Sequence, residues 1–97
     1  MKMIEELTKF LESSIKLLVD NPDEVHVNIT TSTKSIMGQI RVARSDFGKV
    51  IGRKGKTIES LKIISTAVKN TNFSEDTRNV ILEILEDEHQ NFKSVVR

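Results

Sequence analysis

Apolar residues in the first part of the chain follow a helical period. Between residues 3 and 19 they recur at spacings of three and four, which places them along one face of an amphipathic helix. This apolar stripe consists of Ile4, Leu7, Leu11, Ile15 and Leu18. The segment Asn21-Pro22-Asp23 is expected to end the helix and turn the chain, because proline disfavours helical backbone angles in the residue before it.

The next two segments alternate between apolar and polar residues, which is typical of half-buried strands. In the first, the apolar side chains are Val25, Val27 and Ile29, and the polar ones are His26, Asn28 and Thr30. We expect His26 to face solvent rather than to take part in catalysis. A polar loop, residues 31–35, leads to a second strand over residues 36–43, so the two strands can pair as an antiparallel hairpin.

A short helix, a glycine turn and a longer helix follow. Ser45 is expected to be the N-cap of a helix over residues 46–51, and Asp46 in its first turn agrees with the helix dipole. The longer helix is predicted over residues 56–69. Its core-facing stripe consists of Ile58, Leu61, Ile64, Ala67 and Val68. Ile63 points away from the centre of that stripe, so it lies either at the margin of the core or against a partner.

The last third of the chain predicts one more strand and a polar tail. Residues 70–78 form a polar loop, and residues 79–86 form a strand. One face of this strand carries Val80, Leu82 and Ile84, and the other carries Ile81 and Leu85. The tail, residues 87–97, is hydrophilic apart from Phe92, Val95 and Val96, whose spacing allows a short helix. The tail either covers Ile81 and Leu85 or frays.

These elements predict one α+β domain over residues 1–97, with a core at about residues 4–86. The order is α-β-β-α-α-β, and the two-helix crossover before the last strand makes that strand a parallel neighbour of an earlier one. The expected architecture has two layers: a three-stranded mixed sheet covered on one face by three helices.

Composition narrows the class of protein. With 97 residues, 37% hydrophobic and 30% charged, the chain is typical of one soluble globular domain. It contains no apolar run as long as a membrane span and no signal-peptide apolar region at its N-terminus. The absence of cysteine excludes disulfides and thiolate metal sites and is compatible with the cytoplasm, where we expect the protein. Two isolated histidines give no metal cluster, so we expect no metal and no cofactor.

The positive charge of the chain is concentrated around its glycine turn. Residues 41–69 hold eight lysines or arginines against two acidic residues, a net charge of +6, whereas the whole chain carries +1. Within the stretch Val50-Ile51-Gly52-Arg53-Lys54-Gly55-Lys56-Thr57-Ile58, two glycines flank two cations just before a helix begins. A helix N-terminus presents unpaired N–H groups and a positive dipole, so this turn suits a phosphate. We therefore expect a backbone-phosphate clamp for nucleic acid.

Other chemical interpretations of the same residues are weaker. Gly55-Lys56-Thr57 resembles the end of an ATP-binding P-loop, but that motif needs a glycine where the chain has Val50. The acidic residues 83–88 meet no convergent histidine or second cluster, which favours solvated charge over an acid/base pair. The remaining alternative is a plain helix–helix joint, since such turns often contain glycine. A plain joint needs no cations, so their concentration counts against it.

The glycine turn and its surroundings resemble the KH domain, in which a GXXG loop joins two helices and clamps backbone nucleotides. The element order is similar to the type II, common bacterial form. The segment Leu18-Val19-Asp20-Asn21-Pro22-Asp23-Glu24-Val25-His26-Val27 and the residues Arg41-Val42-Ala43 and Asp46 to Gly52 are similar to the small single-domain bacterial KH proteins of the KhpA/YlqC family. The resemblance covers about residues 4–86, and the tail is longer than the family pattern.

The resemblance implies a non-catalytic protein that binds single-stranded RNA and accepts single-stranded DNA. It assigns nucleic-acid binding to Lys49, Val50, Ile51, Gly52, Arg53, Lys54, Gly55, Lys56 and Ile58, with the aliphatic members forming a groove wall. Residues 70–78 take the place of the family's variable loop. It also implies a homodimer, pairing with a larger KH protein of the KhpB/Jag type, and a role in RNA regulation or as an RNA chaperone linked to cell division and cell-wall synthesis, which affects cell shape.

An interpretation from a different class is a protein–protein adaptor. In that case the helix that carries Ile63 would be the contact face for a second copy or a KhpB/Jag-type partner, and RNA binding would be weak or lost. The two interpretations differ in what the cations of the turn do. Reversing the charges of Arg53 and Lys54 removes RNA binding under the first and leaves the adaptor intact under the second.

Overall fold

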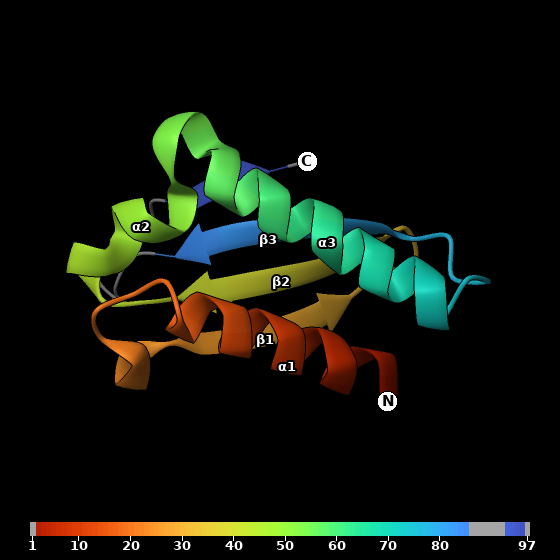
Figure 1. The fold of residues 1–97 in the computed structure, drawn as a ribbon. Coiled ribbons are helices and arrows are strands. Elements are labelled where there is room, and N and C mark those ends of the chain that lie inside the picture. Colours follow the sequence, from red (N-terminus) through yellow and green to blue (C-terminus); the bar gives the residue numbers. More distant parts are fainter. Residues whose placement is uncertain (1, 86–92, 97) are drawn as a thin grey trace.

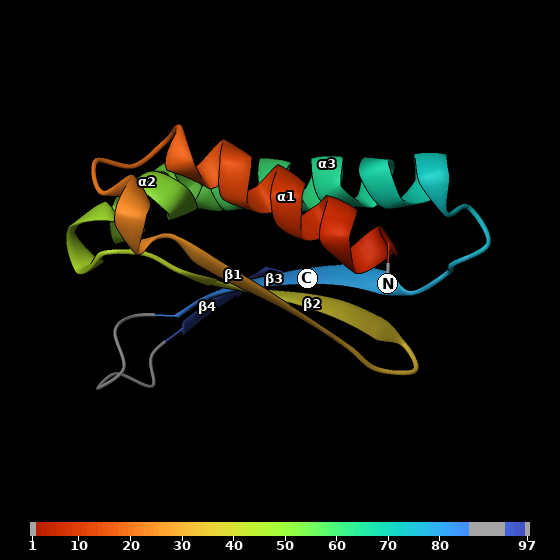
Figure 2. The ribbon, with the colours of Figure 1, turned by 90° about the horizontal axis from the view of Figure 1, so that it is seen from below.

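The computed structural model describes residues 2–85 and 93–96, and its helices and strands form two layers (Figures 1 and 2). The helices are α1 (Lys2–Lys16), α2 (Phe47–Ile51) and α3 (Lys56–Asn72). The strands are β1 (His26–Thr31), β2 (Ser35–Arg41), β3 (Asn79–Leu85) and β4 (Lys93–Val96). Single 3-10 turns, η1 (Pro22–Glu24), η2 (Arg44–Asp46) and η3 (Arg53–Gly55), join several of them. The predicted order α-β-β-α-α-β is confirmed.

The sheet is mixed, as predicted, and its strands lie in the order β1-β2-β3-β4. β1 pairs antiparallel with β2, and β3 returns after α2 and α3 to pair parallel with β2. β4 adds a strand that the sequence did not predict, antiparallel to β3. The short helix expected in the tail is therefore wrong over residues 93–96, where the valines favour a strand and the edge of β3 offers a partner. The rest of the predicted tail, including Phe92, lies outside the described residues.

The core lies between the sheet and the helices, which all cover the same face of the sheet (Figure 2). Its fully buried aliphatic residues come from α1, both central strands and the two later helices. They include Leu7, Leu11, Ile15, Ile36, Ile40, Val50, Ile58, Leu82 and Ile84. At Gly38 in β2, a Cβ atom would lie 3.0 Å from Leu82 Cδ2 and 3.4 Å from Leu11 Cδ1. The glycine thus lets α1 approach the middle of the sheet closely.

The buried face of α3 differs from the predicted stripe. Ile64 is 49% exposed and Ala67 is exposed, whereas Ser65 and Lys69 are buried. The buried line of α3 runs through Ile58, Leu61, Ser65 and Lys69. These residues follow the helical period as well as the predicted set does, but two of them are polar, so hydrophobicity alone pointed to the wrong side of the helix.

α1 also ends earlier than predicted, at Lys16 rather than residue 19. Leu18, placed in the apolar stripe by its spacing, is consequently 40% exposed. Met3, which the spacing analysis omitted, is buried at the other end of the same helix. The error at Leu18 comes from a predicted helix end that lies too late in the chain, and not from a wrong helical period.

Candidate nucleic-acid interface

The turn between α2 and α3, residues 52–55, is named here the glycine turn, and its first glycine is required by two constraints. Gly52 has φ +79° and ψ 174°, a conformation that other residues rarely adopt. A Cβ atom there would lie 2.1 Å from Thr57 Oγ1 and 2.6 Å from Thr57 Cβ. The Gly52 N–H donates to the carbonyl oxygen of Gly48 at 2.8 Å, which ends α2. No side chain can therefore replace the hydrogen at position 52 without moving Thr57.

The second half of the glycine turn is also left-handed but is open to solvent. Gly55 has φ +75° and ψ 13°, with no atom within 4 Å of where a Cβ would stand. Lys54 has φ +56°, and among the described residues it is the one non-glycine residue with positive φ. The Gly55 N–H donates to the carbonyl oxygen of Gly52 at 3.1 Å, closing the turn. This geometry turns the backbone sharply and leaves Arg53 and Lys54 exposed.

The glycine turn delivers the chain to the N-terminus of α3, a helix of 17 residues. Gly55 occupies the N-cap position, and no side chain caps the first turn of the helix. The first backbone N–H groups of a helix have no partner inside the helix, and the helix dipole adds positive potential at the same point. An anionic oxygen can therefore be bound here by main-chain groups alone.

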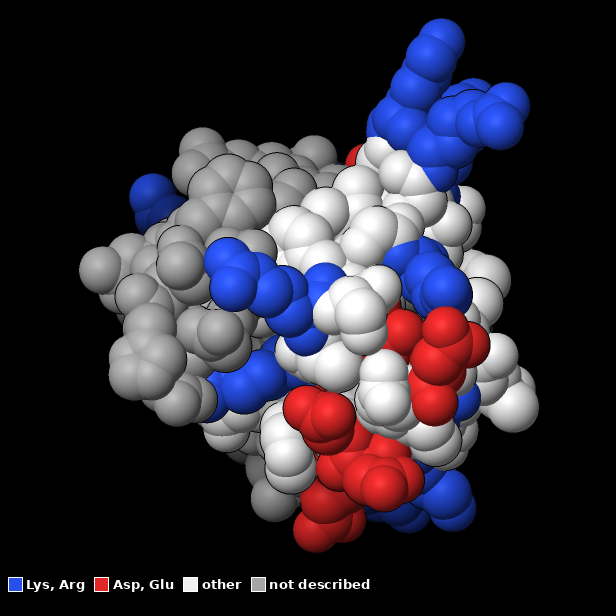
Figure 3. All heavy atoms as spheres, turned by 90° about the vertical axis from the view of Figure 1, so that its left-hand side faces the viewer, with Lys and Arg blue, Asp and Glu red and all other residues white. Residues whose placement is uncertain are grey.

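Three cations surround this helix N-terminus and are available to a ligand. The side chains of Arg53, Lys54 and Lys56 are exposed, and these side chains form no hydrogen bond or ion pair with any described residue. Figure 3 views this end of the molecule and shows lysine and arginine side chains projecting from one corner, while acidic side chains gather on the opposite part of the face. The cations that project furthest on this face therefore lie together at one corner, apart from its acidic side chains.

Lys49, the other cation assigned to the interface, is in a different state. Its Nζ lies 3.1 Å from Asp20 Oδ2, and both side chains are largely exposed. An exposed ion pair of this kind is weak, so an incoming phosphate can compete for the lysine. Lys49 therefore joins α2 to the segment after α1 in the free protein.

The same segment after α1 is held more firmly by Asp46, which is fully buried. Asp46 Oδ1 accepts a hydrogen bond from the Asp20 N–H at 3.1 Å. Asp46 Oδ2 accepts from the Asn21 N–H and from Asn21 Nδ2, both at 3.0 Å. The sequence analysis placed Ser45 as the N-cap of the short helix. That prediction is wrong, because Asp46 occupies the N-cap position of α2 and its side chain serves the preceding segment instead of the helix.

These contacts set the ionisation of the Asp46 carboxyl. Burial by itself raises its pKa, but the hydrogen bonds from the Asp20 N–H and from Asn21, with the charge of Lys49, outweigh burial and lower the pKa below its ordinary value. Asp46 is therefore a carboxylate at neutral pH. It anchors the start of α2, the helix whose other end is Gly52.

Two of the aliphatic residues assigned to the groove wall lie in the core. Val50 and Ile58 are 0% exposed, and they pack with the residues of the two-layer interior. Ile51 is half-buried and packs against the same cluster. Because a fully buried side chain offers no surface to a ligand, Val50 and Ile58 can support the glycine turn only from inside.

A hollow beside α3 supplies the apolar surface instead. It lies between α3 and the first residues of β3 and is named here the α3–β3 groove. Its lining includes Lys62, Ile63 and Thr66 from α3 and Asn79, Val80 and Ile81 from β3. Ile63 is 58% exposed, so it lies outside the core. The structure thus brings together the glycine turn and, along the same helix, an open groove with an isoleucine in its wall.

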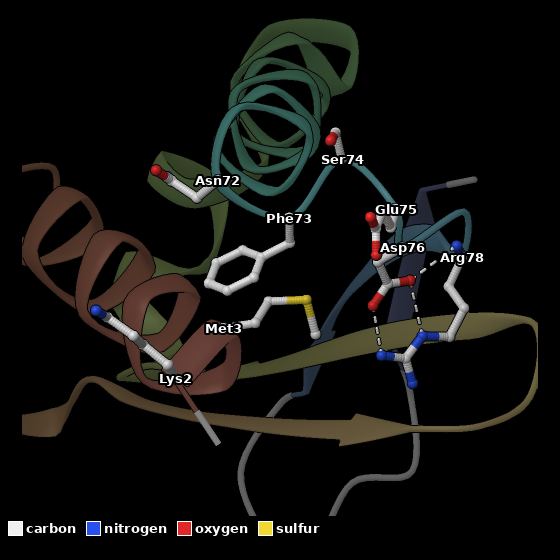
Figure 4. Close-up of a pocket in the computed structure, with 8 residues that line it drawn as sticks. All are labelled: Lys2, Met3, Asn72, Phe73, Ser74, Glu75, Asp76 and Arg78. Atoms are coloured by element: carbon white, nitrogen blue, oxygen red, sulfur yellow. Dashed lines mark hydrogen bonds and ion pairs between the residues drawn. The ribbon is translucent and has the colours of Figure 1, made fainter.

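The other end of the groove is formed by the 73–78 loop, which connects α3 to β3. The Arg78 side chain donates two hydrogen bonds to the carboxylate of Asp76, Nε to Oδ1 at 3.0 Å and Nη2 to Oδ2 at 2.6 Å, and its backbone N–H donates a third to Oδ1 at 3.0 Å. The buried Lys69 donates from Nζ to the carbonyl oxygen of Asp76. Figure 4 shows this ion pair beside a pocket in which Met3 and Phe73 lie close to each other. Arg78 and Lys69 are thus both engaged with Asp76 and hold this loop in place.

Little in the sequence indicates these internal hydrogen bonds and ion pairs. Asp46 looked like a helix-start residue, and Lys69 like part of the basic stretch, because a sequence does not show which backbone groups face a side chain. The position of Lys69, four residues after Ser65 on the buried line of α3, is the one periodic clue. Within residues 2–85 and 93–96, no cluster of histidine or acidic side chains could hold a metal ion. In the same residues, no helix is long and apolar enough to cross a membrane.

Comparison with known proteins gives a consistent set of matches. A sequence model described as "KhpA/KhpB, KH domain" matches residues 8–84. The chain is 37% identical over 81 residues to the RNA-binding protein KhpA of Chlamydia trachomatis, covering 84% of this chain and 99% of the relative. It is 40% identical over 79 residues to the protein of the same name from Clostridium acetobutylicum, covering 81% of this chain and 100% of the relative. No solved structure gives a significant match.

Proposed function

Because the chain belongs to the KhpA/KhpB family of KH domains, we propose that it binds single-stranded RNA by clamping the backbone at the glycine turn. The family is one of non-enzymatic RNA-binding proteins. The observation that carries the proposal is the uncapped N-terminus of α3 with three exposed, unpaired cations around it, among the residues described. Main-chain N–H groups bind a phosphate oxygen there, and Arg53, Lys54 and Lys56 neutralise the adjacent charge.

The remaining residues of the interface take graded roles in this proposal. Lys49 exchanges Asp20 for a phosphate, and Ile51 borders the turn. Val50 and Ile58 hold the turn in place from the core. The chain has four phenylalanines and no tyrosine or tryptophan, so it offers little aromatic surface on which bases could stack. Bases lie instead in the α3–β3 groove against the aliphatic side chain of Ile63. A footprint of about four nucleotides gives modest affinity that falls with salt, since counterion release dominates such binding. Single-stranded DNA, which offers the same phosphates, is a second ligand.

The biological use of this binding is a further part of the proposal. A small non-catalytic domain that grips the RNA backbone acts as a post-transcriptional regulator or an RNA chaperone, and the sequence resemblance links that role to cell division and the cell envelope. Such a lone domain gains avidity by dimerising or by pairing with a larger KH protein of the KhpB/Jag type, because a second site raises the effective concentration. RNA can be cross-linked in cells to the wild type and to the variant with Arg53→Asp and Lys54→Asp. A comparison of the two tests whether the role in cell division and the cell envelope depends on RNA binding.

The test of the clamp is a pair of double variants titrated with a labelled short single-stranded RNA at two salt concentrations, with binding read by fluorescence anisotropy. Arg53→Asp with Lys54→Asp removes binding while circular dichroism shows an intact fold. The matched control, Lys9→Asp with Lys34→Asp, changes the net charge equally at two exposed positions away from the turn. It keeps most of the affinity. Equal losses in both double variants would reduce the clamp to a non-specific charge effect and contradict it.

A second function, that of a protein–protein adaptor, is favoured by one observation. Ile63 and Ile64 are 58% and 49% exposed on α3, and Leu17 is 87% exposed after α1. Exposed large apolar residues on one helix suit a helix–helix contact between two copies of the domain. We propose this contact as a homodimer surface that includes Ile63. Binding of protein partners without binding of RNA by a folded wild type would favour the adaptor over the clamp.

A further inference from the structure

β4 occupies the outer edge of β3. Its backbone pairs with β3 over four residues, from Leu82 opposite Val96 to Leu85 opposite Lys93. β4 also contacts α3, so it lies at the side of the sheet that α3 borders. Without β4, β3 would be the last strand on this side, with a row of unpaired N–H and C=O groups.

The paired part of β3 is the part nearer the glycine turn. β3 runs toward the α2 end of the molecule, so residues 82–85 lie closer to the turn than residues 79–81 (Figure 1). Residues 79–81 have no partner in β4, and they line the α3–β3 groove together with Lys62 and Ile63. The open groove therefore ends at the point along β3 where pairing with β4 begins. The paired residues 82–85 lie between the groove and the glycine turn.

A strand edge and a nucleotide base can form the same kind of hydrogen bond. Bases present donors and acceptors along their edges, and a free strand edge presents alternating main-chain donors and acceptors. RNA held by its phosphates at the glycine turn has its next bases beside this edge of β3. Residues 82–85 cannot pair with β4 and with bases at the same time.

β4 lies outside the part of the chain that matches the family. The family match ends at residue 84, before β4 begins at Lys93. The Clostridium acetobutylicum relative is matched over all of its own length by 79 residues of this chain. The strand is thus an addition to the shared domain, placed on the edge that borders the proposed RNA site.

We propose that β4 is a built-in competitor of RNA, which must leave the outer edge of β3 before the groove can take bases along its full length. This inference rests on the proposed function, since it concerns the same RNA site. β4 weakens RNA binding by occupying the edge of β3. If about one molecule in ten has its β3 edge free, the apparent affinity is reduced about tenfold.

The experiment separates β4 from the rest of the fold by changing main-chain donors only. Ser94→Pro with Val95→Pro removes two neighbouring N–H groups of β4, so at least one ladder hydrogen bond is lost whichever residue faces β3. Ser94→Ala with Val95→Ala keeps both N–H groups and is the control. Hydrogen exchange at residues 82–85 reports whether the β3 edge has been freed, and circular dichroism reports the fold. Anisotropy with a labelled single-stranded RNA then gives the affinity of each full-length chain.

The proline variant is expected to bind the RNA about tenfold more tightly than the wild type, with the alanine variant near the wild type. Wild-type or weaker affinity in a proline variant whose β3 edge exchanges faster overturns the proposal, and β4 is then only edge protection. Absence of binding in both proteins overturns it as well. Adding Arg53→Asp with Lys54→Asp to the proline variant distinguishes the two proposals: continued tight binding would contradict the clamp while leaving the effect of β4 intact.

Discussion

The two ends of α3 use the same residue types in opposite ways. At the N-terminal end, the side chains of Arg53 and Lys54 project from a sharp turn and form no hydrogen bond or ion pair with any described residue. At the C-terminal end, Arg78 is bonded to Asp76 and Lys69 is buried with its Nζ on a backbone carbonyl. A lysine or arginine can bind a ligand only where the fold has not already used it. The cations at the two ends of α3 therefore differ in state: those at the glycine turn are free to meet a ligand, and those at the other end hold the fold together.

The glycine turn and the 73–78 loop also differ in their backbone conformation. The glycine turn holds three residues at positive φ, Gly52, Lys54 and Gly55, whereas the 73–78 loop has none. Backbone strain costs free energy and persists where surrounding contacts impose it, often at sites that bind ligands. Here the buried Asp46 anchors one end of α2, and at the other end Thr57 leaves room for no side chain at Gly52.

The largest expected effect comes from placing a side chain at Gly52. Gly52→Ala forces a Cβ against Thr57 in a backbone conformation that alanine avoids, so the free energy of unfolding should fall by about 3 kcal/mol or more. Gly48→Ala is the control, because Gly48 lies within α2 with open space at its Cβ position. It should change stability by less than about 1 kcal/mol. Urea denaturation measures both. Equal, small effects would show that the glycine turn is not constrained as described.

The second prediction exchanges the roles of two lysines. Lys69→Met keeps the buried stem but leaves the Asp76 carbonyl without its donor, so stability should fall by about 1–3 kcal/mol while the folded protein binds RNA normally. Lys54→Met should show the reverse: RNA affinity falls several-fold, and stability changes by less than about 0.5 kcal/mol. Denaturation and anisotropy on both variants give the four values. A loss of RNA binding in folded Lys69→Met would remove the distinction between the two ends.

The third prediction concerns acid. Hydrogen bonds from the Arg78 side chain and backbone, against a smaller effect of burial, lower the pKa of Asp76 from 3.8 to about 2. The folded state holds this proton less tightly than the unfolded chain, so the ion pair stabilises the fold above pH 3.8 and loses that contribution as the pH falls toward 2. Asp76→Asn should lower stability at neutral pH and flatten the pH dependence between these values, measured by denaturation at a series of pH values. An unchanged pH profile would contradict the assigned pKa.

The smallest effect on stability is expected at the exposed isoleucines of α3. Ile63→Asp and Ile64→Asp should each change stability by less than about 0.5 kcal/mol, because both side chains are largely exposed. Sedimentation at tens of micromolar then tests the dimer, which Ile63→Asp should convert to a folded monomer. A wild type that is already monomeric at this concentration would end the dimer proposal. Since Ile63 lines the groove and Ile64 does not, a loss of RNA binding confined to Ile63→Asp would assign that residue to RNA.

Much of the fold could be predicted from period alone. The alternation Val25, Val27, Ile29 and the spacing of Leu7, Leu11 and Ile15 reflect burial against a single core, so they predict elements that form in this chain. The prediction failed where polar residues are buried or where an edge is filled. Ser65 and Lys69 hide the true face of α3, and β4 forms because β3 has a free edge, which no local pattern shows.

The glycine turn itself could be predicted from the sequence, but the contacts of the residues around it could not. Gly52 and Gly55 stand out because positive φ is nearly reserved for glycine, and the cations between them cannot be hidden in so short a turn. The pairing of Lys49 with Asp20 and the burial of Val50 and Ile58 depend on how α2 sits on its neighbours. The sequence therefore indicated a phosphate clamp but not which of its residues face a ligand.

The most direct test of the clamp is to record amide chemical shifts of isotope-labelled protein while a short single-stranded RNA is added. Binding at the glycine turn predicts the largest changes at residues 52–58, smaller ones along the α3–β3 groove, and little change on the helix-free face of the sheet. If RNA binds and the largest changes fall in the 73–78 loop or on the helix-free face of the sheet, the clamp is in the wrong place and the account is contradicted.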